Sequence, residues 1–354
     1  MLATAVVTLA RAARAWSSAR RGAIVAVLAP VLALAGATFA AAIGATDAQA
    51  ADDAWPARTV RIVVPYGAGG AGDLTIRVLA NKLSENLRQP FVVENRPGAG
   101  GMVAMRTVLG AAADGYTLGE MGNGQAISTT LFNLPYDVLG DFAQVSIAAR
   151  FSVLLVVGPG SPFRTVTDVI AAARAAPGKL NLGAINPGST QNLSAHLFQE
   201  LSGARFEIVT YRTTPDLVTA LLRGEVDLGF DYYAGLESTI GPDKLRVIAT
   251  SGEERDPVLK DVPTVKESGL PDYAAMGWNG LVTASAVAPG IVEKLSAEVR
   301  RALSAPDVQE RMLQLGLDAR GTTPQEMRAR MTGDIAKWRR VIENAQIPSH
   351  RTDP

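Results

Sequence analysis

The 354-residue sequence contains no cysteine and only two histidines. The absence of cysteine excludes a thiolate nucleophile, a zinc–cysteine site and any disulfide, and it leaves the redox compartment open. His196 has a candidate partner in Ser189, but seven residues along one predicted helix separate the two side chains by about two turns. That separation is too large for a nucleophile and its general base.

The acidic side chains also fail to form a catalytic pair. Asp227 and Asp231 flank an apolar strand, and four residues of extended chain separate them by more than about 12 Å. The sequence contains no group of histidines and carboxylates at metal-ligand spacing. We therefore expect no catalytic residues, no metal and no cofactor, and the sequence predicts a protein that is not an enzyme.

Neither sign of charge is in excess, because Lys+Arg and Asp+Glu both total 34. Residues 1–50 hold four Arg and one Asp, so the rest of the chain has 30 basic and 33 acidic groups, a formal net charge of −3. A nucleic-acid-binding domain is expected to carry a basic surface. The balance therefore argues against a nucleic-acid partner.

The amino-terminal segment has the three regions of a secretory signal. Four arginines and no acidic residue occupy the first 22 positions, and an almost wholly apolar run covers residues 23–43. The small residues Ala48 and Ala50 then mark a cleavage site. We expect residues 1–50 to be a signal peptide cleaved after Ala50, which would place the mature chain in the periplasm. The apolar run is also long enough to remain as an uncleaved anchor.

From Trp55 onward, short apolar runs alternate with helical patterns. The run Thr59–Tyr66 predicts a strand, and the following residues up to Leu87 repeat apolar side chains at helical spacing. This alternation is typical of βαβ units around a largely parallel sheet. With 354 residues and 47% hydrophobic composition, the chain is large enough for two α/β domains.

The sequence indicates two points at which the chain crosses between these domains. The apolar strand Phe151–Val157 is followed by a turn with two prolines and a glycine at 159–162, after which the strand–helix alternation restarts. Around Tyr273–Thr283 a strand is predicted to return to the first domain. Two such crossings would act as a hinge. We expect lobe 1 to contain residues 55–155 and 280–354, and lobe 2 to contain residues 156–279.

A glycine-rich turn connects the first predicted strand to the first helix. Glycines at a helix N-terminus let an anionic ligand approach exposed backbone N–H groups. Gly67, Gly69 and Gly72 also satisfy the dinucleotide fingerprint, with Glu94 lying 22 residues beyond Gly72 as the candidate ribose ligand. Such glycine patterns often match by chance. An exported dinucleotide-binding oxidoreductase or a hydrolase is therefore kept as the alternative function.

Two further loops, at residues 123–128 and 186–192, are rich in Ser, Thr and Asn. Their side chains suit the orientation of a small polar solute, because ligand pockets combine apolar walls with a few placed polar groups. Each of these residues alone could equally be a helix cap. Several such loops at the carboxyl ends of strands indicate a crevice, which is where open α/β sheets bind ligands.

Six short strings support a family resemblance. They are Val92 to Gly101 (VVENRPGAGG), Asp114 to Leu118 (DGYTL), Leu134 to Asp137 (LPYD), Pro177 to Asn181 (PGKLN), Gly224 to Leu228 (GEVDL) and Asp261 to Thr264 (DVPT). With these strings in this order, the chain from Trp55 to about Ile347 resembles the periplasmic solute receptors of tripartite tricarboxylate transporters, the Bug-type receptors. The resemblance implies a fold like that of type II periplasmic binding proteins, in which two α/β lobes joined by two hinge crossings close like a Venus flytrap.

The resemblance also implies a function and a site. Such a receptor binds a small carboxylate-type organic solute between its lobes, as a monomer, and delivers it to the membrane permease subunits of the transporter. Loops from both lobes hold the ligand carboxylate through backbone amides, hydroxyls and ordered waters. The substrate-binding residues implied by position are, in lobe 1, Tyr66, Gly67, Ala68, Gly69, Gly70, Asp73, Asn123, Gln125 and Ala126, and, in lobe 2, Asn186, Gly188, Ser189, Thr190, Gln191, Asn192 and Asp231. Gly67 and Ala68 depart from the proline-containing pair usual in the family, so the identity of the solute stays open.

Overall fold

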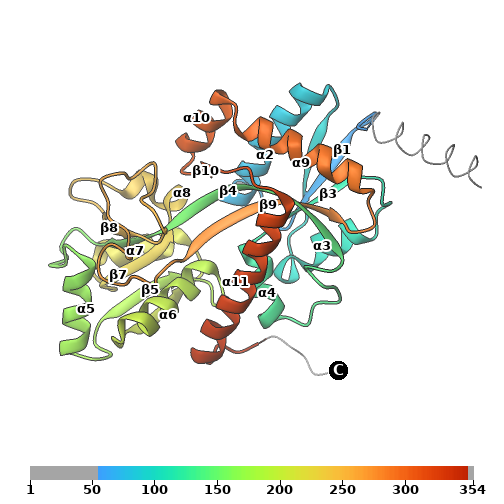
Figure 1. Ribbon diagram of the computed structural model, residues 1–354. Coiled ribbons are helices and arrows are strands. Elements are labelled where there is room, and N and C mark those ends of the chain that lie inside the picture. Colours follow the sequence, from blue (N-terminus) through green and yellow to red (C-terminus); the bar gives the residue numbers. More distant parts are fainter. Residues whose placement is uncertain (1–54, 350–354) are drawn as a thin grey trace, which may run out of the picture. The chain divides into compact units, whose positions relative to one another are not determined.

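The computed structural model describes residues 55–349, and the chain from Pro56 onward belongs to one compact unit. The predicted signal peptide at residues 1–50 and its cleavage after Ala50 lie outside the described residues. None of the described helices combines the length and the apolar character that crossing a membrane requires. Strands and helices alternate through most of this unit, which confirms the predicted α/β class (Figure 1).

The strands form one ten-stranded sheet with two halves that share a strand. In the first half, β1 pairs in parallel with β2 and β3, and β3 continues the sheet into the antiparallel β9. Apolar and β-branched residues between glycine or proline turns explain why β1 and β2 form. The strands of this half are β1 (Val60–Val64), β2 (Phe91–Asn95), β3 (Thr117–Gly122), β9 (Met276–Ala284) and the short β10 (Asp318–Ala319).

The second half repeats the parallel arrangement. β5 pairs in parallel with both β6 and β7, as the strand–helix alternation predicts. β7 and β8 each pair antiparallel with the shared strand. The strands of this half are β5 (Asn181–Ile185), β6 (Glu207–Tyr211), β7 (Leu228–Tyr232) and β8 (Arg246–Thr250).

The shared strand is β4, which covers the 16 residues Phe142–Val157. Its part up to Ser152 pairs with β9, whereas its last residues from Val153 pair with β7 and β8. The sequence predicted only its apolar end, because Gln144, Ser146 and Arg150 interrupt the apolar pattern of the earlier part. One continuous strand therefore runs from one half of the sheet into the other (Figure 1).

The pairing bears on where the lobes divide. β4 changes partners between Ser152 and Val153, and β9 pairs with β4 in the first half already from Met276. The predicted lobe boundaries, 155/156 and 279/280, lie three and four residues beyond these points. Strand pairing alone does not define a domain boundary, so the division stays a prediction.

Helices cover the sheet, and serine or threonine N-caps begin four of them. The cap hydroxyls of Thr165, Ser189, Thr213 and Thr323 each accept a hydrogen bond from a backbone N–H in the first helical turn. The helices of the first half are α2 (Ala71–Leu87), η1 (Ala99–Gly101), α3 (Met102–Leu109), α4 (Asn123–Leu131), α9 (Pro289–Leu303) and α10 (Pro306–Gln314). Those of the second half are α5 (Val166–Ala175), α6 (Thr190–Ser202), α7 (Thr214–Arg223), α8 (Tyr233–Leu236) and η2 (Glu237–Thr239).

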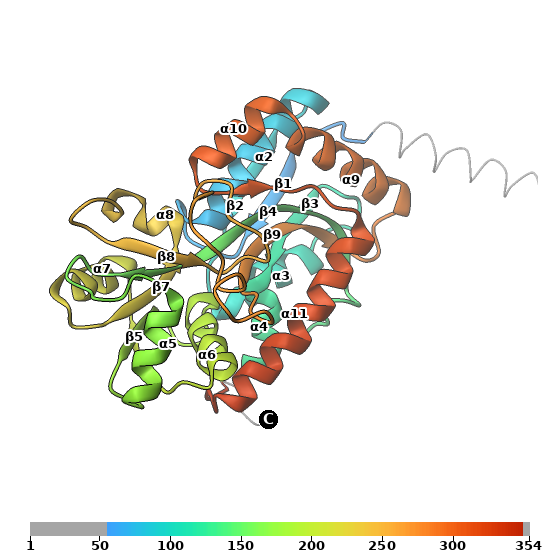
Figure 2. The same cartoon turned by 60° about the vertical axis from the view of Figure 1, so that its left-hand side comes forward.

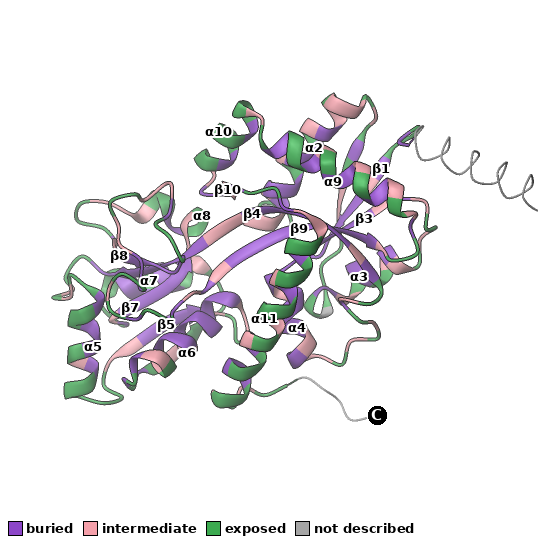
Figure 3. Cartoon of the chain, viewed as in Figure 1, coloured by how far each residue is buried: buried purple, intermediate pink, exposed green. Residues whose placement is uncertain are grey.

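The carboxy-terminal helix α11 (Pro324–Asn344) contacts both α4 and α6 (Figures 1 and 2). Its Trp338 is fully buried, as are Trp278 on β9 and Tyr273 just before it. Figure 3 shows buried residues along β4 and β9 and on the inner faces of the helices, with exposed residues on the outer faces. The core therefore continues through the region where the two halves of the sheet meet.

Candidate functional site

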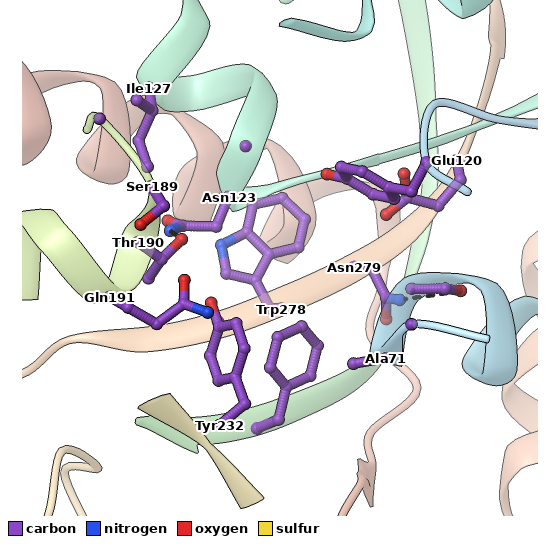
Figure 4. Close-up of a pocket in the computed structure, with 17 residues that line it drawn as sticks. Ala71, Glu120, Asn123, Ile127, Ser189, Thr190, Gln191, Tyr232, Trp278 and Asn279 are labelled. Atoms are coloured by element: carbon purple, nitrogen blue, oxygen red, sulfur yellow. Dashed lines mark hydrogen bonds between the residues drawn. The ribbon is translucent and has the colours of Figure 1, made fainter. Parts of the chain in front are cut away.

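A cavity of about 340 Å³ is lined by residues from both halves of the sheet (Figure 4). Three helices begin at this cavity. Gly70, Ala71 and Gly72 line it at the start of α2, Asn123 and Gly124 at the start of α4, and Gly188 to Gln191 at the start of α6. The volume is that of a pocket for a small solute.

The three helix starts give the cavity a positive character without a cationic side chain. The first backbone N–H groups of a helix have no partner within the helix, and the helix dipole places partial positive charge there. At α2 the N-cap is Gly70, and no side chain caps the helix. None of the described residues that line the cavity is Lys, Arg or His. An anion such as a carboxylate would therefore be held by backbone donors.

Four aromatic side chains, those of Tyr66, Phe151, Tyr232 and Trp278, form much of the remaining wall. The rings of Phe151 and Tyr232 meet edge to face, with their centroids 4.9 Å apart. Burial raises the pKa of the Tyr232 hydroxyl, which therefore stays neutral. The walls can cover an apolar part of a solute and still offer hydroxyl groups.

Glycine is required beneath Tyr66. A Cβ atom at Gly124 would lie 2.7 Å from the Tyr66 hydroxyl oxygen, and one at Gly72 would lie 3.0 Å from its ring. Both distances are too short for a side chain to fit without displacing Tyr66. Gly72 at the start of α2 and Gly124 at the start of α4 let the Tyr66 side chain pack against the N-termini of both helices.

Glu120 is the single acidic residue among the described residues that line the cavity. It lies on β3, is fully buried, and has no protein donor among the described residues within hydrogen-bonding distance of either carboxylate oxygen. Burial raises its pKa from 4.5 to about 8. In the ligand-free chain the carboxyl group is therefore mostly protonated at neutral pH.

A chain of hydrogen bonds links the elements on either side of the cavity. The indole Nε1 of Trp338 donates to Asn123 Oδ1 at 2.7 Å, and Asn123 Nδ2 donates to Thr190 Oγ1, also at 2.7 Å. Asn123 begins α4 in the first half, and Thr190 begins α6 in the second. A single buried amide thus joins α11, α4 and α6 at the cavity.

Replacing Asn123 by Ala should lower the free energy of unfolding by about 1–3 kcal/mol, because it leaves the Trp338 indole N–H buried without its partner and removes the link to Thr190. Chemical denaturation measures this loss. Asn181→Ala is the matched control, since the Asn181 side chain makes only a long, exposed hydrogen bond of 3.4 Å. Equal effects of the two substitutions would show that the Asn123 link contributes nothing.

The structure brings seven of the sixteen predicted residues to the cavity. They are Tyr66, Gly70, Asn123, Gly188, Ser189, Thr190 and Gln191. They come from three segments far apart in the sequence. The loops after β1, β3 and β5 therefore meet at one place, as expected for carboxyl ends of neighbouring strands.

Four other predicted residues do not line the cavity but form hydrogen bonds with the loops around it. Asp73 Oδ2 accepts the N–H of Gly69 at 2.9 Å, and Gln125 Oε1 accepts that of Gly122 at 2.9 Å. In the second half, Asn192 Oδ1 accepts the N–H of Gly188 at 3.0 Å. Asp231 accepts from Gln191 Nε2 at 3.1 Å and from the Thr214 hydroxyl at 2.6 Å, which fixes the Gln191 amide beside the cavity.

The last five predicted residues do not line the cavity. Gly67, Ala68, Gly69 and Asn186 are exposed in the two loops, whereas Ala126 is buried in the core. Glu94 on β2, which the dinucleotide alternative would use, forms ion pairs with Arg61 on β1 and with Arg96 and does not line the cavity either. The geometry therefore gives that alternative no support.

Ten further residues line the cavity. Four of them, Ala71, Gly72, Gly124 and Ile127, lie within the glycine-rich turn and the loop 123–128 that the sequence indicated. The other six were not predicted, and they are Glu120, Phe151, Tyr232, Gly277, Trp278 and Asn279. Glu120 carried a usable signal, because it is an acidic residue inside an apolar strand. Nothing comparable marks the β9 residues, which reach the cavity only because β9 lies between β3 and β4.

Comparison with known proteins identifies related sequences along most of the chain. The family model described as "Tripartite tricarboxylate transporter family receptor" matches residues 75–347. The UPF0065 protein in the tcbD-tcbE intergenic region of a Pseudomonas species is 32% identical over 320 residues, covering 90% of this chain and 95% of that protein. BugT of Bordetella pertussis is 30% identical over 293 residues, covering 82% and 90%.

Solved structures share the fold. Rpa4515 of R. palustris, determined with adipate, has a TM-score of 0.72 and 31% identity and covers 84% of this chain and 100% of that one. MatC of Rhodopseudomonas palustris, with bound malate, has a TM-score of 0.67 and 31% identity and covers 81% and 100%. The periplasmic binding protein BugD has a TM-score of 0.68 and 26% identity and covers 84% and 100%. These similarities confirm the predicted two-lobe fold.

Proposed function

Because the chain belongs to the tripartite tricarboxylate transporter receptor family, we propose that it binds one small carboxylate-type solute in the cavity between its two lobes. Members of this family are periplasmic solute receptors and not enzymes. The observation that best supports the proposal is the meeting of three helix N-termini at a small cavity without basic side chains. The solute would leave the protein chemically unchanged.

The proposed contacts follow from which atoms face the cavity. Backbone N–H groups at the starts of α2 and α6, together with the Thr190 side chain, would bind the solute carboxylate. Asn192 and Asp231 would act indirectly, since they hold Gly188 and Gln191, which line the cavity, and Asp73 would act by fixing the turn before α2. Closure of the lobes would exclude water, which strengthens each of these hydrogen bonds.

The related structures narrow the first candidates to be tested. Rpa4515 was determined with adipate and MatC with malate, and each is 31% identical to this chain. We propose small dicarboxylates and related organic acids as the first class to screen. The protein would act in the periplasm as a monomer, after removal of residues 1–50, and would deliver the solute to the permease subunits of a membrane transporter.

A thermal-shift screen of residues 51–354 against carboxylates, amides and aromatic acids tests the proposal. A ligand present at 100 times its dissociation constant should stabilise the protein by about 2.7 kcal/mol, which raises the melting temperature measurably. The solute recovered after incubation should be chemically unchanged by mass spectrometry. Turnover of an ester, an amide or a nicotinamide cofactor would instead support the enzyme alternatives.

Gly70→Val should abolish most of the ligand-induced rise in melting temperature while leaving the fold intact. Gly70 lines the cavity in an extended conformation (φ −78°, ψ 167°) that valine adopts readily, and no atom lies within 4 Å of an added Cβ. The new side chain would thus occupy space near the solute rather than disturb the protein.

Gly67→Val is the matched control, because Gly67 lies in the same turn, has equal free space and does not line the cavity. Gly69 is unsuitable, since its φ of +91° would strain any valine. If Gly70→Val binds solute as strongly as Gly67→Val does, the start of α2 is not part of the site.

A further inference from the structure

Two unpaired hydrogen-bond acceptors face the cavity from adjacent strands. In the β3–β9 register Glu120 lies opposite Leu281, and Gly122 lies opposite Asn279, so Glu120 and Asn279 are diagonal neighbours on one face of the sheet. Asn279 Nδ2 donates to the Gly72 carbonyl at 3.4 Å, which leaves its Oδ1 buried without a partner. Both carboxylate oxygens of Glu120 also lack a protein donor among the described residues.

Such an arrangement is costly unless a donor satisfies it. Burying a polar group without a hydrogen bond destabilises the folded chain, and almost all buried polar side chains in proteins have partners. The two acceptors lie side by side, so a group with several N–H donors could satisfy both. An ammonium group has three donors and carries the charge that an ionised Glu120 would neutralise.

Within residues 55–349, no cationic side chain lines the cavity to fill this role. The other titratable groups that line the cavity among the described residues are the hydroxyls of Tyr66, from the loop after β1, and Tyr232, from the end of β7, and of these Tyr66 interacts with Glu120. At the start of α2, Asp73 and Arg77 are paired with each other at 2.8 Å and do not line the cavity. No charge therefore balances Glu120 once it ionises, other than a charge brought by the solute.

The opposite side of the cavity has a different chemistry. In Figure 4, Ser189, Thr190 and Gln191 lie across the cavity from Glu120 and Asn279. The start of α6 offers backbone donors there, which favour an anion. The side chains of Tyr232 and Trp278 lie between the two sides (Figure 4), and aromatic rings can attract a cation. The α6 side of the cavity thus offers donors, whereas on the other side Glu120 and Asn279 place unpaired acceptors beside the start of α2.

We propose that Glu120 and Asn279 bind a protonated amino group, and that the solute of this receptor is accordingly a carboxylate that also carries an ammonium group. This assignment rests on the proposed function and specifies the solute class of the same cavity. On binding, the Glu120 carboxyl group loses its proton to the solvent and becomes the counter-ion of the ammonium group. Asn279 Oδ1 accepts a second N–H from the same group.

Matched pairs of ligands test the assignment on the unchanged protein. Malate is compared with aspartate, and adipate with 2-aminoadipate, by isothermal titration calorimetry at pH 7. The amino-bearing member of at least one pair should bind about 10-fold more tightly or better, as expected for a charge-assisted hydrogen bond. Titration in two buffers of different ionisation enthalpy should show release of close to one proton for each amino-bearing ligand bound.

The variant Glu120→Gln provides the second arm, because glutamine keeps the shape of the side chain but cannot ionise. Its preference for the amino-bearing ligand should fall by about 10-fold or more, and the proton release should disappear. Unchanged preference in this variant overturns the assignment, and so does tighter binding of malate and adipate than of their amino partners to the unchanged protein. With either of these two results, the proposal that the protein is a carboxylate receptor is not contradicted. Failure of every carboxylate to bind, with or without an amino group, contradicts the proposed function as well.

Discussion

At pH 8.5 the ligand-free variant Glu120→Gln should melt about 5 °C or more above the unchanged protein. Glu120 is fully buried without a partner, and burial raises its pKa from 4.5 to about 8. Below about pH 8 the Glu120 carboxyl group of the folded chain keeps its proton, and above that pH it must ionise in a buried site. In the unfolded chain it ionises freely. Glutamine removes this penalty because it stays neutral in both states.

The sign and the pH range follow from linkage. Between pH 4.5 and about 8 the folded chain binds the Glu120 proton and the unfolded chain does not, so stability falls as the pH rises. At about 1.4 kcal/mol per pH unit, the full range corresponds to at most about 5 kcal/mol. Half of that would raise the melting temperature of a chain of this size by about 5 °C. Near pH 4.5 the variant and the unchanged protein should melt together.

Differential scanning calorimetry at several pH values measures this difference. Glu254→Gln is the control, because the Glu254 side chain is 88% exposed and its nearest cationic group is 4.0 Å away. It should change the melting temperature little at any pH. If the difference in melting temperature between Glu120→Gln and the unchanged protein is the same at pH 4.5 and pH 8.5, Glu120 is not buried and protonated as described. A stabilising variant at this position would also indicate that the glutamate is retained for ligand binding at a cost in stability.

Replacing Asp334 by Ala should lower the free energy of unfolding by about 3–5 kcal/mol. Asp334 lies on α11, is 3% exposed, and accepts hydrogen bonds from Trp278 Nε1 at 2.7 Å and Arg330 Nε at 2.7 Å. Lys337 Nζ lies 2.9 Å from its other oxygen. Burial disfavours the charged carboxylate, but Lys337 and Arg330 outweigh it and hold the pKa of Asp334 below its usual value. Without Asp334, two partly buried cations and a buried indole N–H lose their common partner.

Equilibrium denaturation in urea measures the loss. Asp307→Ala is the matched control, since Asp307 forms an ion pair of 2.8 Å with Lys82 but is 64% exposed. An exposed pair of this kind contributes less than about 1 kcal/mol. Similar losses for the two variants would contradict a structural role for the buried cluster. Because Asp334 also holds the Trp278 indole, its removal should loosen one wall of the cavity.

Much of the architecture could be predicted from local patterns. Apolar runs such as Val60–Val64, followed by apolar residues at helical spacing, predict the alternation of strands and helices in βαβ units. Turn residues mark where each element ends. The start of α6 was predicted as a polar loop and helix, and it lies at the cavity. The longer part of β4 was missed, because polar residues such as Gln144 are buried there by pairing with β9, which no local pattern reveals.

The sequence predicted the parts of the candidate site that are formed by loops. It did not predict the parts that are formed by residues within strands. The family resemblance implied Asp231 as a contact residue, but its carboxylate accepts hydrogen bonds from Gln191 and Thr214 and does not line the cavity. Trp278 and Asn279 lie within β9 and reach the cavity only through the order of the strands. Strand order depends on contacts between segments distant in the sequence, so these residues carry no signal of their own.

For protein engineering, β4 decides where the chain can be opened. Its two parts pair with different halves of the sheet, so a reporter domain inserted within Phe142–Val157 would interrupt hydrogen bonding in both at once. The turn at 241–244 joins elements of one half only and is a safer insertion point. A fluorescent sensor built on this chain would keep β4 whole and carry one dye on each half. The absence of native cysteine means that two introduced thiols would be the only labelling sites.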